Sequence, residues 1–335
     1  MAFSHRYPPP IHQGTPIAEQ LTIAEAVEEA DPAKLLKLVD GLCKGREWDA
    51  LVDLKARCRH AVERGKQLWS IADHIEYRLA LEAPGEWAGP MVFEGAGRFT
   101  LGPLPEVAAS RHTWAELSPY LPEGPARTVT AYERVVRGED LTEAPGIDPN
   151  MIELPLKLMD WEPVYLQATY HADKADFPAP ELPRMRQVEL PQIPSPPADE
   201  PDSIDALLGL TRPWAEESNG RAEAVVVHGD SLGSIRALGP SRARMAPITP
   251  AVALTLMAWT ASSGGAHGRR PGAAAGRYGA WWTAAALTDL LDEWPVEPDH
   301  LGAAVHELNW YVWSDLIAPT GWTFHLAVED PQHGL

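Results

Sequence analysis

Eight prolines crowd residues 178–201 and limit what this chain can fold into. Proline lacks a backbone N–H and clashes with the preceding helical turn, so this density excludes helix and favours an extended, polyproline-like chain. We therefore expect a mainly α-helical protein with minor β hairpin or strand elements. Two helical lobes would cover residues 1–145 and 221–335, joined by a Pro-rich extended connector at 146–220. That connector is either a solvated linker or a strap that lies across the protein.

Boundary signals in the first lobe predict short helices. Thr22 begins a T-x-x-E capping box, and Asp31, which proline follows, has the pattern of an N-cap. We expect the helix after Asp31 to end at Gly41, because glycine commonly follows a helix C-terminus. Apolar residues at three- and four-residue steps predict another helix over 47–63, and short turns between such helices are typical of a helical-hairpin stack. Residues 91–101 have the pattern of a small β-hairpin or an ordered excursion.

The last third is again mainly helical by its pattern, and it is rich in tryptophan. Seven of the 13 tryptophans lie between Trp259 and Trp322. Most such large aromatic side chains pack in a core, and the rest could form a recognition surface. Thr249, which proline follows, predicts a helix start. We expect further helices over about 273–291 and 299–316, and strand-like segments at 224–227 and 322–328.

Charge is segregated along this last third. Residues 231–280 contain six arginines and neither lysine nor acid, whereas residues 281–335 contain nine acids and neither lysine nor arginine. The whole chain has a net charge of −19, which repels phosphate backbones and argues against nucleic-acid binding. The acidity could serve solubility alone, or it could attract a basic protein partner. We favour a non-catalytic interaction or adaptor protein whose acidic surface meets such a partner.

The basic block contains a glycine-rich link between two expected helices. Glycine-rich backbone before a helix exposes N–H groups, and arginine adds paired donors, so a small anion or an acidic peptide could bind there. The candidate ligand-binding residues are His267, Arg269, Arg270 and Arg277. In the alternative, the small residues let two helices pack closely, and these arginines pair with acids of 281–335. A third interpretation is a small-molecule-binding sensor that uses the Trp-rich lobe, and a deep apolar pocket beside Arg269 and Arg277 would favour it.

Two short blocks suggest a different class of function. The sequence VHGDSL stands at 227–232 after a run of valines, and DPQH stands at 330–333. They resemble the G-D-S-L and closing D-x-x-H blocks of the GDSL lipase/esterase family. That resemblance implies a serine esterase with the nucleophile Ser231, the general base His333, and Asp330 to orient the imidazole. The alternative is a strand-to-helix turn in which Asp230 or Ser231 caps a short helix.

The remaining sequence signals concern location and cofactors. Cys43 and Cys58 are the only cysteines, and no apolar leader precedes them, so we expect reduced thiols and a cytoplasmic protein. The longest apolar stretch, residues 250–261, is too short to span a bilayer, which argues against a membrane protein. No cofactor fingerprint or metal-ligand spacing stands out, so we expect no cofactor and no metal, and an enzyme is the less favoured class. The sequence does not define the oligomeric state.

Overall fold

The computed structural model describes residues 17–217, 219–316 and 321–335. The described chain is rich in helices and has a few short antiparallel strands, which confirms the predicted mainly α-helical class with minor β structure. The helices are α1 (Ile17–Glu29), α2 (Pro32–Gly45), α3 (Trp48–Glu63), α4 (Trp69–Glu82), α5 (Gly85–Ala88), α6 (Leu104–Ala109), α7 (Trp114–Leu117), α8 (Pro125–Val136), α9 (Pro201–Leu210), α10 (Arg212–Glu216), α11 (Ser231–Ala237), α12 (Pro250–Ser263), α13 (Ala273–Leu287) and α14 (Pro298–Glu307). The strands are β1 (Thr169–Tyr170), β2 (Ala175–Asp176), β3 (Arg186–Glu189), β4 (Arg242–Ile248), β5 (Asn309–Ser314) and β6 (Leu326–Glu329), and short 3-10 helices are η1 (Gly89–Met91), η2 (Pro149–Met151) and η3 (Leu291–Glu293).

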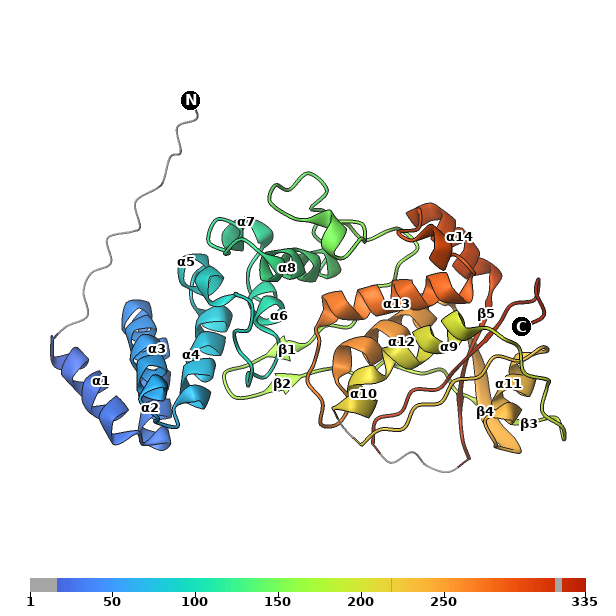
Figure 1. Ribbon diagram of the computed structural model, residues 1–335, viewed down its shortest axis with the longest axis horizontal. Helices are drawn as coiled ribbons and strands as arrows, with labels where there is room; N and C mark the ends of the chain where they lie inside the picture. The colour runs from blue at the N-terminus through green and yellow to red at the C-terminus, as the bar shows by residue number, and fades with distance from the viewer. Residues whose placement is uncertain (1–16, 218, 317–320) are drawn as a thin grey trace.

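Buried apolar side chains gather in separate clusters along the molecule. In Figure 1, helices α1–α8 form one end, and α9–α14 with the larger sheet form the other. A first cluster lies among the N-terminal helices and includes Leu54. A second surrounds α12 and α13 and includes Met257 and Trp281. A third, smaller cluster packs Ile235 of α11 with Trp313 of β5.

Local capping signals placed several helix starts correctly. The Asp31 carboxylate accepts the backbone N–H of Ala33 at 2.9 Å and so begins α2 as predicted. Thr249 caps α12 in the same way, and Asp230 caps α11, which confirms the turn interpretation of that block. Helix α3 matches the predicted span 47–63 to within one residue at its start.

Two helix boundaries predicted near the N-terminus, one start and one end, were wrong. Helix α1 begins at Ile17, so Thr22 lies inside it, because the residues before Thr22 are themselves good helix formers. Helix α2 continues past Gly41 to Gly45, and Arg46 takes the left-handed conformation that ends it. Burial explains the extension, since Leu42 and Cys43 continue the apolar face of α2 into the core.

Of the two possibilities predicted for residues 91–101, the structure has the ordered excursion and not the hairpin: η1 ends at Met91, and turns follow, held by hydrogen bonds to buried carboxylates. Another segment differs from prediction. The helix expected over 299–316 is split, because α14 ends at Glu307 and β5 begins at Asn309. The sequence of β5 is aromatic and β-branched, and pairing with β4 on one side and β6 on the other stabilises the extended form.

The larger sheet has the strand order β3-β4-β5-β6 and is antiparallel throughout. In its register Val188 lies opposite Ala243, and Met245 lies opposite Trp313. Strand β3 comes from the Pro-rich segment and occupies an edge, where a proline-flanked strand is tolerated. Of the predicted strand at 224–227, Val227 alone pairs, in a single bridge to Pro197, whereas β6 forms at the end of the segment expected at 322–328.

Helices α12 and α13 approach each other closely through glycine. A methyl group added at Gly276 would overlap the carbonyl oxygen of Ala258 and lie 2.8 Å from Cβ of Ser262. One at Gly279 would lie 2.9 Å from Cβ of Ala261. The small residues of α13 therefore serve close packing, as the structural alternative predicts. Within the described ranges, none of the helices is both long and apolar enough to cross a membrane.

Candidate functional site

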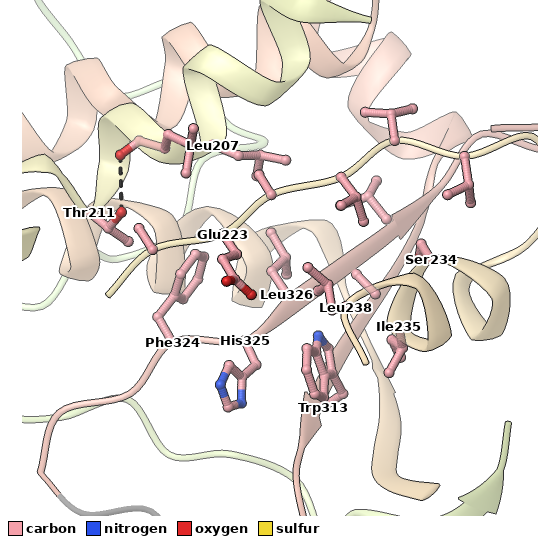
Figure 2. A pocket seen from close by; sticks show the side chains of 18 of the residues that line it. Leu207, Thr211, Glu223, Ser234, Ile235, Leu238, Trp313, Phe324, His325 and Leu326 are labelled. Atoms are coloured by element: carbon pink, nitrogen blue, oxygen red, sulfur yellow. Dashed lines mark hydrogen bonds between the residues drawn. The ribbon is translucent and has the colours of Figure 1, made fainter. Parts of the chain in front are cut away.

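A pocket of about 850 Å³ opens beside the larger sheet. Helix α9, the extended segment 220–228, helix α11 and the strands β5 and β6 provide its walls. Figure 2 shows side chains from α9, α11 and β6 that point into the same space from different sides. Its apolar lining includes Leu207, Val226, Ile235, Leu238, Trp313 and Phe324.

Helix α11 forms one wall because glycine lets it dock tightly. A side chain at Gly233 would overlap the hydroxyl of Ser195 in the Pro-rich segment. Gly229, just before the helix, has a φ of 150°, which L residues rarely adopt. The Asp230 carboxylate then accepts the N–H of Gly233 at 2.8 Å and sets the start of the helix. These contacts turn Ile235 and Leu238 toward the pocket.

Neutral polar groups stand beside these apolar residues in the lining. The hydroxyl of Thr211 donates to the carbonyl of Leu208 at 3.0 Å, and that of Ser234 donates to the carbonyl of Ser231 at 2.9 Å. The imidazole of His325 stacks on Trp313 with ring centroids 4.4 Å apart. Burial lowers the pKa of His325, although the nearby Asp315 opposes the shift, so the ring is neutral at neutral pH.

Carboxylates outnumber cations around the pocket. Its acids are Glu200, Glu223, Asp230, Asp315 and Asp330, and its basic residues are Arg221 and Arg242. Both arginines are already neutralised, because Arg221 pairs with Glu223 and Arg242 pairs with Glu189 at 3.2 Å. The electrostatic potential inside the pocket is therefore negative, which disfavours an anionic ligand.

Tryptophans close one end of the pocket. The rings of Trp259 and Trp322 stack at 5.0 Å, and Trp214 meets both edge-on at 5.6 and 6.1 Å. The indole N–H of Trp214 donates to the carbonyl of Thr260, which fixes the ring. Trp214 and Trp322 line the pocket directly, so part of the tryptophan cluster is available to a ligand.

Of the predicted triad residues, Asp330 lines this pocket, whereas Ser231 and His333 are not among its lining residues. The Asp330 carboxylate and Nδ1 of His333 are 2.7 Å apart, and Gly229 N–H donates to the carbonyl of Gly334 at 2.9 Å. The C-terminal turn therefore lies beside the turn that precedes Ser231. Ser231 is a buried residue, and no hydrogen bond among the described residues joins its hydroxyl to His333.

The pair of Asp330 and His333 shifts both pKa values in the direction of an ion pair. The hydrogen bond to Asp330, together with its charge, raises the pKa of His333. Partial burial alone would raise the pKa of Asp330, but hydrogen bonds from His333 and from backbone N–H groups outweigh burial and lower it. The side chain of His333 is 68% exposed, so solvent reaches this imidazole.

The structure places Arg277 and Arg270 in internal ion pairs. The guanidinium of Arg277 is completely buried and binds the carboxylate of Glu162 at 2.7 Å. Arg270 binds Glu106 at 2.6 Å and stacks on the ring of Phe177. Both carboxylates precede residue 170, so the expectation that acids of 281–335 would pair with these arginines was wrong. The ion pairs instead tie α13 and the loop before it to the N-terminal half.

The other two predicted ligand residues lie at the surface. His267 and Arg269 are both exposed. The backbone N–H of Arg269 donates to Glu217 at 2.9 Å, and its guanidinium lies 5.4 Å from the ring centroid of Phe99. Residues 262–280 are here called the Arg/Gly segment, and none of them lines the pocket.

Sequence reasoning missed the buried carboxylates that organise the centre of the molecule. Glu133 of α8 accepts the backbone N–H of Ala274 at 2.9 Å and pairs with Arg137 at 2.6 Å. Complete burial, followed by the charge of Glu106, raises the pKa of Glu133 to about 7. The apolar residues around Glu133 indicated a buried helix face, but no local sequence pattern identified the residues that pair with Glu133. Within the described ranges, no three His, Cys, Asp or Glu side chains gather in a way that could hold a metal.

The fold and the pocket thus define a mainly α-helical protein with a small antiparallel sheet and a largely apolar cavity. The chain belongs to a protein family of unknown function, DUF6183, which it matches over residues 33–329. That span includes nearly all of the pocket. No curated protein and no solved structure matches the chain.

Proposed function

We propose that this protein binds a small, largely apolar molecule in the pocket beside the larger sheet. The observation that carries the proposal is a cavity of about 850 Å³ with an aromatic and aliphatic lining. Known small-molecule sites occupy roughly 300–1,000 Å³ and combine such a lining with a few polar groups that orient the ligand. Here Thr211, Ser234 and the neutral His325 are uncharged polar groups of the lining, which also carries the acids and arginines named above.

The charge of the lining narrows the ligand class. Asp315 and Glu200 have no cationic partner among the described residues, and both arginines of the pocket are paired. A neutral molecule or an amine is therefore favoured over a carboxylate or a phosphate. The faces of Trp214 and Trp322 at one end would add cation–π attraction for an amine.

A displacement assay tests both the site and the charge preference. The fluorescence of the neutral dye Nile red would report binding to an apolar cavity, and decylamine and decanoate would compete as a pair with one alkyl chain and opposite charge. Decylamine should displace the dye at lower concentration. Leu207→Trp and Leu326→Trp, which narrow the pocket, should each weaken dye binding by about tenfold. Leu36→Trp, on the exposed face of α2, is the matched control. Equal binding by all three variants would rule out this pocket.

Ester hydrolysis is a second candidate function, and the geometry of the C-terminal turn favours it. The resemblance to the GDSL family assigns Asp330 to orient His333, and their 2.7 Å contact has that geometry. Ser231 is buried and directly follows Asp230, which lines the pocket. Its hydroxyl would have to reach Nε2 of His333 for the histidine to act as general base.

A panel of p-nitrophenyl esters with increasing acyl length tests this candidate. Hydrolysis should be abolished by Ser231→Ala and by His333→Ala. Ser110→Ala is the control, because the hydroxyl of Ser110 donates to a backbone carbonyl and Ser110 does not line the pocket. Turnover that survives Ser231→Ala would exclude this serine as the nucleophile.

The adaptor role predicted from the net charge rests on the acidic composition alone. No contact in the described residues bears on a basic partner, so that role stays a prediction. Binding of a basic protein should weaken steeply with added salt if the acidic surface attracts it.

A further inference from the structure

Three segments that are distant in sequence meet at an exposed aromatic patch, and none of its residues lines the pocket. Its members are Trp69, Arg98, Phe99 and Arg269, here called the Phe99 patch. The rings of Trp69 and Phe99 have centroids 4.3 Å apart, and the side chains remain 39% and 56% exposed. Arg98 and Arg269 lie over the ring of Phe99, with guanidinium carbons 5.8 and 5.4 Å from its centroid.

The loop that carries Phe99 is held firmly from below. The N–H of Phe99 donates to Asp73 at 3.1 Å, and that of Gly97 donates to Glu76 at 3.4 Å. The side chains of both carboxylates are almost fully buried, and Arg59 neutralises them. Burying two carboxylates costs free energy. In this protein both of them accept hydrogen bonds from the backbone of one short loop. The aromatic ring above is therefore presented in a fixed position at the surface.

Further contacts hold the two ends of the same loop. The hydroxyl of Thr100 donates to the carbonyl oxygens of Gly97 and Gly102, both at 2.7 Å. Gly97 has a φ of 65°, and a methyl group there would lie 2.6 Å from Leu104. Aromatic residues and arginine often dominate the binding energy at protein interfaces, and here a rigid, exposed aromatic ring lies beside arginine. Little conformational entropy would be lost when a partner binds a loop that is already ordered.

Charge identifies the kind of partner. Within residues 17–217, 219–316 and 321–335, neither Arg98 nor Arg269 has a carboxylate partner for its guanidinium. Two guanidinium groups close to one ring offer donors to carboxylates that flank an apolar side chain.

We propose that the Phe99 patch binds an acidic segment of a partner protein, with an apolar side chain seated on Trp69 and Phe99 and carboxylates bound by Arg98 and Arg269. The proposal does not depend on the pocket or its ligand. Single-stranded nucleic acid also combines negative charge with flat rings, but its repeated phosphates would be repelled by the rest of this acidic chain. An acidic peptide can concentrate its charge at the two arginines alone.

Peptide selection on the full chain tests the proposal. Random peptides displayed on phage would be selected on the wild type and counter-selected on the Arg98→Glu/Arg269→Glu double variant. The enriched peptides should place Asp or Glu beside Phe, Leu or Trp. Their synthetic versions should bind the wild type at least about tenfold more tightly than Phe99→Ser or the double variant. Arg184→Glu/Arg244→Glu, which reverses two other exposed arginines, should bind like the wild type.

The outcomes separate the proposal from its alternatives. Circular dichroism would first establish that each variant is folded, and Arg98→Gln/Arg269→Gln provides a milder pair if charge reversal unfolds the chain. Enrichment of basic peptides, or no enrichment, would overturn the proposal. Tighter binding of a labelled oligouridine than of any selected peptide would assign the patch to nucleic acid. Equal loss of binding in the Arg184→Glu/Arg244→Glu control would show an effect of net charge alone.

Discussion

Neutralising the carboxylate of Glu162 should destabilise the protein more than most single substitutions. In Glu162→Gln the side chain keeps its shape but loses its charge. The carboxylate accepts five hydrogen bonds: from Arg277 Nε at 2.8 Å and Nη2 at 2.7 Å, from Trp281 Nε1 at 2.9 Å, from the Tyr165 hydroxyl at 2.7 Å and from the Met159 N–H at 2.9 Å. An amide NH₂ cannot accept, so at least two of these buried donors would lose their acceptor.

The charge that remains on buried Arg277 determines how much stability is lost. The Arg277 guanidinium is fully buried, and without Glu162 it retains only the carbonyls of Pro155 and Lys157. Breaking a buried ion pair from one side costs about 3–5 kcal/mol. That is a large share of a typical unfolding free energy of about 5–15 kcal/mol. The double variant Glu162→Leu/Arg277→Met removes both charges and should lose less stability than Glu162→Gln.

Urea denaturation followed by circular dichroism measures these losses. Glu216→Gln is the control, because its partner Arg212 is exposed and such a pair contributes at most about 0.5 kcal/mol. A loss below about 1 kcal/mol for Glu162→Gln would refute the reasoning.

The pH dependence of stability gives a second check. Burial raises the pKa of Glu162, but Arg277 and the other donors outweigh it and lower the pKa below 4.5. The wild type should therefore lose stability as pH falls below about 4.5, and Glu162→Gln should lose less.

Three further substitutions have outcomes set by particular contacts. Folded Glu133 keeps its proton up to about pH 7, whereas the unfolded chain releases it near 4.5, so stability should fall as pH rises between these values. Glu133→Gln should flatten that slope in urea titrations at a series of pH values, and an unchanged slope would contradict the conclusion that burial raises the pKa of Glu133. Gly276→Val would push α13 away from Ala258 and should cost about 1–3 kcal/mol in urea denaturation, while Gly41→Val, where the added carbon meets nothing, should not. Asp31→Ala removes the cap of α2 and should lower the unfolding free energy by about 1 kcal/mol, and equal stability would show that solvent satisfies the freed N–H of Ala33 equally well.

The ion pairs also indicate how the two ends of the molecule are joined. Glu106, Glu133 and Glu162 lie in or after the N-terminal helices, and all three bind the Arg/Gly loop or α13. Burial and mutual charge make each of these contacts sensitive to protonation or substitution. A change at Arg270 or Arg277 would therefore be felt first as lost stability, and a binding defect in such a variant is meaningful only after folding is established.

Sequence alone determined the features that depend on nearby residues. A cap joins a side chain to a backbone N–H two or three positions away, so Asp31, Thr249 and Asp230 could be assigned as helix starts from local spacing. The proline density between 178 and 201 excluded helix for a reason that lies within each residue. The small residues of α13 likewise indicated close helix packing before a partner was known.

Only the tertiary structure decided the features whose partners are far along the chain. Residues 309–314 became β5 because β4 and β6 pair with them, although the same residues fit a helical pattern. Arg270 and Arg277 found carboxylates 164 and 115 residues away, and no spacing rule connects such positions. The pocket and the Phe99 patch each arise where several distant segments meet. Burial and pairing require segments that are distant in sequence to come together, and the local sequence of one segment does not specify its partner.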